Sequence, residues 1–138
     1  MGRILAIDYG LKRTGLAVTD PMQIIASGLT ALDNALLIPF LTDYISKESV
    51  DKIVIGYPLN LDGSETHITS DVEQFINKLN KLFPSVIVIK EDERFTSKMA
   101  VRALIDSGVK KMKRRDKKLI DKMSAVLILQ SYLEHKEK

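Results

Sequence analysis

The sequence predicts an α/β protein in which a five-stranded mixed sheet is flanked by helices. Two patterns predict this class: three short apolar runs joined by short turns come first, and apolar runs then alternate with segments of helical periodicity. The length of 138 residues and the apolar content of 45% suit one globular domain, so we expect a single domain over residues 1–138.

The first three strands are expected at Arg3–Asp8, Thr14–Thr19 and Ile24–Leu32. In the first, the run Ile-Leu-Ala-Ile lies between polar ends, and an Asp-Pro pair stops the second. Because tight turns join antiparallel neighbours, these strands should form an antiparallel meander.

From residue 35 onward, strands alternate with helices. Apolar spacing and the positions of proline, glycine and capping residues predict these elements. The first is a helix over Ala35–Glu48, whose regular part begins near Ile38, and it is followed by a strand at Lys52–Gly56, a helix over Val72–Leu82 and a strand at Val86–Ile89. A helix capped by Thr96 or Ser97 and ended by Gly108 comes next, and a last helix runs from about Lys117 to Glu134. Alternation implies right-handed crossovers and parallel pairing, which makes the sheet mixed.

Composition excludes several classes of protein. The absence of cysteine excludes disulfide scaffolds, thiol catalysis and cysteine-ligated zinc. No apolar run reaches the ~18 residues that a membrane-spanning helix needs, and the start meets a charge too early for a signal peptide. We therefore expect a cytoplasmic location and no membrane contact.

Positive charge gathers in one stretch although the net charge is only +3. Between residues 110 and 118, Asp116 is the only acid, and the basic residues are Lys110, Lys111, Lys113, Arg114, Arg115, Lys117 and Lys118. A basic segment on an otherwise mildly acidic chain indicates either contact with a polyanion or a solvated loop.

Acidic residues follow two of the predicted strands. Asp8 ends the first strand, and Asp92 and Glu93 follow the last. Ligands gather at the carboxyl ends of strands in open α/β sheets, so these positions are candidates for chemistry. Considered alone, Asp8 could equally hydrogen-bond the turn after it, and Glu93 could pair with Arg94.

A third acid lies on the last predicted helix. Asp121 is followed one turn later by Ser124 and Ala125, whose small side chains would let that face approach the sheet closely. The alternative is an ordinary first-turn acid, favoured by the helix dipole. Three carboxylates at one sheet edge would repel one another, and oxygen-only ligands suit Mg²⁺ or Mn²⁺. Two such ions could clamp a phosphodiester, which makes a metal-dependent nuclease plausible.

Four segments together resemble the YqgF/RuvX family, whose members are called Holliday junction resolvases and pre-16S rRNA nucleases. The segments, in family order, are residues 8–20 (DYGLKRTGLAVTD), residues 53–64 (IVIGYPLNLDGS), residues 92–97 (DERFTS) and residues 117–125 (KKLIDKMSA). The sequence departs from the family pattern at two packing positions, with Phe95 in place of leucine and Ser124 in place of alanine.

The resemblance implies an RNase H-like fold and a metal-dependent nuclease. It assigns the catalytic and metal-binding roles to Asp8, Glu93 and Asp121, with Mg²⁺ or Mn²⁺ as cofactor. No fourth acid of the kind found in RNase H relatives is identified, so the resemblance leaves open whether one or two ions bind.

The expected partner is a nucleic acid, either structured RNA or branched DNA, and the chain could be a monomer or a dimer. Candidate substrate contacts are Lys12, Arg13, Arg94, Lys110, Lys111, Lys113, Arg114 and Arg115. We expect a role in 5′-end maturation of the 16S rRNA precursor. The alternatives are resolution of Holliday junctions and nucleic-acid binding without catalysis. An ATPase of the actin type would need two such domains.

Overall fold

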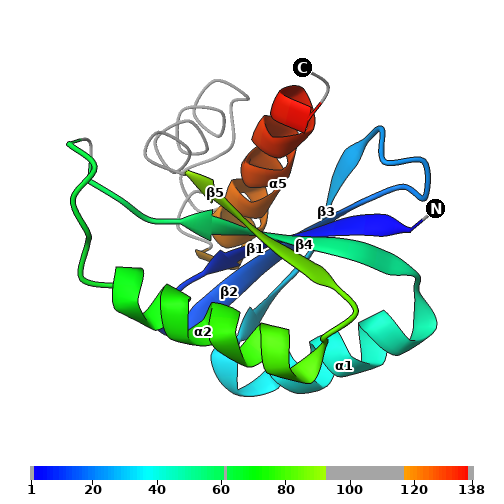
Figure 1. Cartoon of the computed structure of the whole chain (residues 1–138), viewed down its shortest axis with the longest axis horizontal. Coiled ribbons are helices and arrows are strands. Elements are labelled where there is room, and N and C mark those ends of the chain that lie inside the picture. Colours follow the sequence, from blue (N-terminus) through cyan, green and yellow to red (C-terminus); the bar gives the residue numbers. More distant parts are fainter. Residues whose placement is uncertain (1, 61, 93–116, 137–138) are drawn as a thin grey trace.

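One five-stranded sheet forms the centre of the computed structural model (Figure 1), which describes residues 2–60, 62–92 and 117–136. Its strands are β1 (Arg3–Tyr9), β2 (Arg13–Thr19), β3 (Ala26–Asp33), β4 (Val50–Tyr57) and β5 (Ile87–Asp92), in the spatial order β3-β2-β1-β4-β5. The pairs β1–β2 and β2–β3 are antiparallel, whereas β1–β4 and β4–β5 are parallel. The predicted mixed sheet and antiparallel meander are confirmed.

Helices cover both faces of this sheet. A short 3₁₀ turn (Asn34–Leu36) leads into α1 (Leu37–Lys47), and α1 and α2 (Thr69–Leu82) pack on one face. The last helix, α5 (Lys117–Lys136), packs on the other face (Figure 1). The predicted helix between Thr96 and Gly108 lies outside the described residues.

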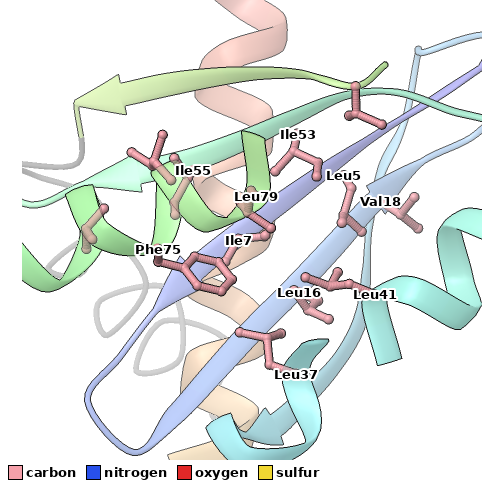
Figure 2. Packing of buried hydrophobic residues seen from close by; sticks show 13 residues of the cluster. Leu5, Ile7, Leu16, Val18, Leu37, Leu41, Ile53, Ile55, Phe75 and Leu79 are labelled. Carbon is pink, nitrogen blue, oxygen red and sulfur yellow. The ribbon is translucent and has the colours of Figure 1, made fainter. Parts of the chain in front are cut away.

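Alternation along the central strand β1 divides the core in two. Leu5 and Ile7 point toward α1 and α2, where Figure 2 shows them among Leu16, Leu37, Ile55 and Phe75. Ile4 and Ala6 point the other way, toward α5. All four of these β1 side chains are fully buried. A strand covered on both faces needs apolar residues at successive positions, which explains the unbroken run Ile-Leu-Ala-Ile.

Most strand boundaries differ from the sequence-based expectation by one to three residues, and the structure shows the reason at two of them. The third strand begins at Ala26, because residues 20–25 form a turn in which the Asp20 carboxylate accepts hydrogen bonds from the backbone N–H groups of Met22, Ile24 and Ile25. These bonds hold the pKa of Asp20 below its usual value. The last strand extends to Asp92 instead of Ile89, because its polar end stays paired with β4 through Tyr57.

The backbone of α5 approaches the sheet closely at Gly15 of β2. A Cβ atom on Gly15 would lie 2.0 Å from the backbone oxygen of Asp121 and 2.4 Å from its carbonyl carbon. Only glycine fits here, since any side chain would overlap the helix backbone. Further along α5, Ser124 and Ala125 are buried against the sheet, as their small size predicts.

We predict that Gly15→Ala displaces α5 from the sheet. Overpacking of this kind costs about 1–3 kcal/mol of unfolding free energy, because backbone and not a mobile side chain must move. Urea denaturation would measure this loss.

Gly28→Ala is the matched control for that experiment. Gly28 lies on the neighbouring strand beneath the same helix, but its added Cβ would meet only the side chain of Lys122, which can move. Equal losses of unfolding free energy for the two variants would contradict the claim that the α5 backbone lies against Gly15.

Candidate metal site and nucleic-acid interface

Asp8 lies near the carboxyl end of β1, on the face covered by α5. It follows Ile4 and Ala6 at the alternate positions of the strand, and both of those residues pack against α5. In the ladder with β2, Asp8 is directly opposite Gly15. The strand therefore fixes the backbone from which this carboxylate projects.

Asp121 reaches the same place from the far end of the chain. Its backbone lies against Gly15, the residue opposite Asp8, so the contact between α5 and β2 brings the two acids to one part of the sheet. Their positions are 113 residues apart in the sequence. Both side chains are intermediate between buried and exposed, which leaves them within reach of a substrate.

Arg13 forms an ion pair with Asp121. Its Nε donates to Asp121 Oδ2 at 3.1 Å, and the two side chains are 26% and 25% exposed. Arg13 comes from the start of β2, two residues before Gly15, and therefore points to the same face of the sheet. The guanidinium balances the charge of Asp121 beside Asp8.

The turn between β1 and β2 carries Lys12 and Arg13. Lys12 is exposed, and Gly10 N–H donates to the Arg13 carbonyl at 3.0 Å. Asn34 secures this turn from the side: its Nδ2 donates to the Gly10 carbonyl at 2.7 Å, and its Oδ1 accepts from the Thr14 hydroxyl at 2.7 Å. Sequence analysis missed Asn34, since nothing in its local pattern reveals contacts with a turn 24 residues away.

An acidic residue that sequence analysis also missed, Glu91, holds the end of β5 to α5. Glu91 is buried, and its Oε2 accepts a hydrogen bond from Ser131 Oγ at 2.7 Å. His135 Nε2 lies 3.2 Å from the same oxygen. Extending the two-residue alternation of the last predicted strand past Ile89 would have placed Glu91 on the α5 face. Asp92, the last residue of β5, is exposed.

On the opposite face of the sheet, a cluster of polar side chains links α2 to the ends of β4 and β5. Tyr57 donates its hydroxyl to Glu73 of α2 at 2.7 Å, and Lys90 of β5 pairs with the same carboxylate and lies 4.7 Å from the Tyr57 ring centroid. The hydrogen bond to Glu73, together with burial, raises the pKa of Tyr57 to about 12. Hydrogen bonds from Lys90 and Tyr57 lower the pKa of Glu73. This cluster fixes α2 to the sheet on the face opposite Asp8 and Asp121.

The remaining predicted site residues lie outside the described residues. These are Glu93, Arg94, Lys110, Lys111, Lys113, Arg114 and Arg115. Within residues 2–60, 62–92 and 117–136, no group of three or more histidine, cysteine or acidic side chains is close enough to hold a metal ion. Asp8 and Asp121 nevertheless supply the carboxylate oxygens that Mg²⁺ and Mn²⁺ prefer, so the donor chemistry fits such an ion.

No helix in the described part of the chain is long and apolar enough to cross a membrane.

The chain is similar to a solved structure from Pseudomonas aeruginosa, which is described as an uncharacterized protein with similarity to peptidase YEAZ. The likeness has a TM-score of 0.44 and 16% identity over 78% of this chain and 50% of that chain. It carries no inference about function.

Curated relatives match over nearly the whole chain. A protein of Porphyromonas gingivalis is 51% identical over 100% of both chains, and one of Flavobacterium psychrophilum is 52% identical over 99% of both. Each bears the name "Putative pre-16S rRNA nuclease". The model of the RuvX family, described as Holliday junction resolvase, matches residues 2–135. The resemblance carried by the four sequence segments is thereby confirmed, and the chain belongs to the RuvX family.

Proposed function

We propose that this protein is a metal-dependent nuclease that hydrolyses phosphodiester bonds in the precursor of 16S rRNA, during maturation of its 5′ end. The observation that carries the proposal is the contact between Asp121 and Gly15, because it brings Asp121, near one end of the chain, to the part of the sheet that holds Asp8, near the other end. The names of the curated relatives support the substrate, and the family supports nuclease chemistry. In this proposal the whole chain acts as one domain in the cytoplasm.

Nucleases of the resolvase family generally use a divalent metal ion. We propose Mg²⁺ or Mn²⁺ here, held by Asp8 and Asp121, with Glu93 as the third ligand on the strength of the sequence resemblance. Such an ion would activate water and stabilise the leaving oxygen of the phosphodiester. Asp8 would contribute rigidity, because its backbone belongs to the central strand of the sheet.

Two contacts prepare the site before any ligand arrives. Arg13 compensates the charge of Asp121, and Asn34 fixes the turn that carries Lys12 and Arg13. In this proposal Lys12 and Arg13 contact substrate phosphates, and Arg13 leaves Asp121 to do so. Backbone contacts of this kind do not separate RNA from DNA, so the choice of RNA rests on the relatives' names.

Cleavage assays test the function directly. The wild-type protein with Mn²⁺ should shorten an RNA that carries the 5′ extension of 16S rRNA, and Asp8→Asn should lose at least about a hundredfold in rate, since even a 1 Å misplacement of a reacting group costs that much. The amide is nearly isosteric with the carboxylate, so thermal melting should show an intact fold.

Asp43→Asn is the control for the loss of one carboxylate. Asp43 is an exposed residue of α1 that pairs only with Lys47 in the described structure, on the far face of the sheet from Asp8. Cleavage of a four-way DNA junction but not of the RNA would favour the alternative drawn from the family description. Binding without cleavage of either, in wild type and Asp8→Asn alike, would make the protein a binding module.

Removing Arg13 should strengthen binding of the free metal ion. The guanidinium and a divalent cation both balance the charge of Asp121, so Arg13→Gln should bind Mn²⁺ several-fold more tightly while its KM for RNA rises. Calorimetric titration would measure the Mn²⁺ affinity. Lys12→Gln removes the same charge from the same turn and is the matched control. Weaker Mn²⁺ binding by Arg13→Gln would instead mean that Arg13 orients Asp121 for the ion.

A further inference from the structure

A shallow groove runs between β3 and the first two turns of α5, on the same face of the sheet as Asp8. Its volume is about 250 Å³. The floor comes from the edge strand and the wall from the helix, and the lining residues are Leu29, Thr30, Ala31, Lys118, Leu119 and Lys122. Both titratable groups in this lining are lysines: Lys118 ends the basic stretch of residues 110–118, and Lys122 lies outside it.

The strand register places this groove relative to the candidate catalytic site. Asp8 is opposite Gly15 in the β1–β2 ladder, and Gly15 is opposite Ala31 in the β2–β3 ladder. Directly opposed residues point to the same face, so these three positions form one row across the sheet. Neighbouring strands are ~4.8 Å apart, so the groove floor lies ~10 Å from the Asp8 position, with the α5 backbone that covers Gly15 between them.

The sheet surface itself holds Lys122 in place. Its Cγ and Cδ lie 2.8 and 3.0 Å from where a Cβ of Gly28 would be, so the aliphatic part of the side chain lies across a strand position that has no side chain. The aliphatic part of Lys122 therefore packs on the sheet, and the residue lines the groove. Asp121, which lies between the two lysines in the sequence, is paired with Arg13.

We propose that this groove binds the phosphodiester backbone of the substrate strand, with Lys118 and Lys122 as the phosphate contacts. The inference rests on the proposed nuclease function and adds to it the path that the strand takes over β3. Contact with phosphates alone makes this part of the site independent of base sequence.

The experiment measures RNA binding in an Asp8→Asn background, so that the RNA is not cut. Lys118→Met and Lys122→Met each remove a charge and keep an unbranched apolar side chain. Fluorescence anisotropy of a labelled single-stranded RNA over a range of KCl gives the slope of log affinity against log salt. Each lost phosphate contact should reduce that slope by about 0.7.

Three further arms make the result specific. Lys81→Met, at an exposed position of α2 on the other face, should leave the slope unchanged. Lys122→Arg should restore it, because the charge returns. In the cleaving protein, Lys118→Met and Lys122→Met should raise KM with little change in kcat.

The groove is not a phosphate site if Lys118→Met and Lys122→Met give the same slope of log affinity against log salt as Lys81→Met. That outcome with normal cleavage by the wild-type protein would leave the proposed function standing. Failure of the wild-type protein to cleave RNA or junction DNA, by contrast, would count against the proposed function itself.

Discussion

The backbone contact between Gly15 and Asp121 is the constraint on which the site depends. A helix that ended the chain anywhere else on the sheet could still bury its apolar face, but it would not bring Asp121 opposite Asp8. The contact exists because Gly15 has no side chain, and a Cβ there would lie 2.0 Å from the Asp121 oxygen. Ser124 and Ala125 keep the next turn close, and Ile128 and Leu129 then bury the helix against the core. Packing and chemistry therefore rest on the same helix face.

This arrangement also organises charge around the site. Arg13 precedes Gly15 by two residues on the same face, which places its guanidinium on Asp121. One strand further out, the row from Asp8 through Gly15 ends at Ala31 in the floor of the lysine-lined groove. The positions of Asp8, of the Asp121–Arg13 ion pair on Gly15 and of the groove floor at Ala31 thus follow one row across the sheet, with α5 over its middle.

The pattern of residues predicts most of the fold, because its main signals are local. The apolar run before Asp8 and the helical spacing of Val72–Leu82 each need only their own neighbours, and both elements form as expected. Features that depend on distant partners were not predictable in this way. The role of Asn34 depends on the Gly10 turn, the extension of β5 depends on pairing with β4, and the ion pair of Arg13 with Asp121 spans 108 residues. Asp8 and Asp121 were candidates from the sequence, and the contact at Gly15 brings their backbones to the same part of the sheet.

The most direct test of this account is a calorimetric titration of Mn²⁺ into four proteins: wild type, Asp8→Asn, Asp121→Asn and the double variant. If both carboxylates hold one ion, each single substitution should weaken Mn²⁺ binding at least about tenfold, and the double variant should lose much less than the sum of the two free-energy changes, because ligands of a shared ion act as a unit. Two results would contradict the claim that the Gly15 contact builds a single metal site. One is an Asp121→Asn variant that binds Mn²⁺ as tightly as the wild type. The other is a double variant whose loss of binding free energy equals the sum of the two single losses.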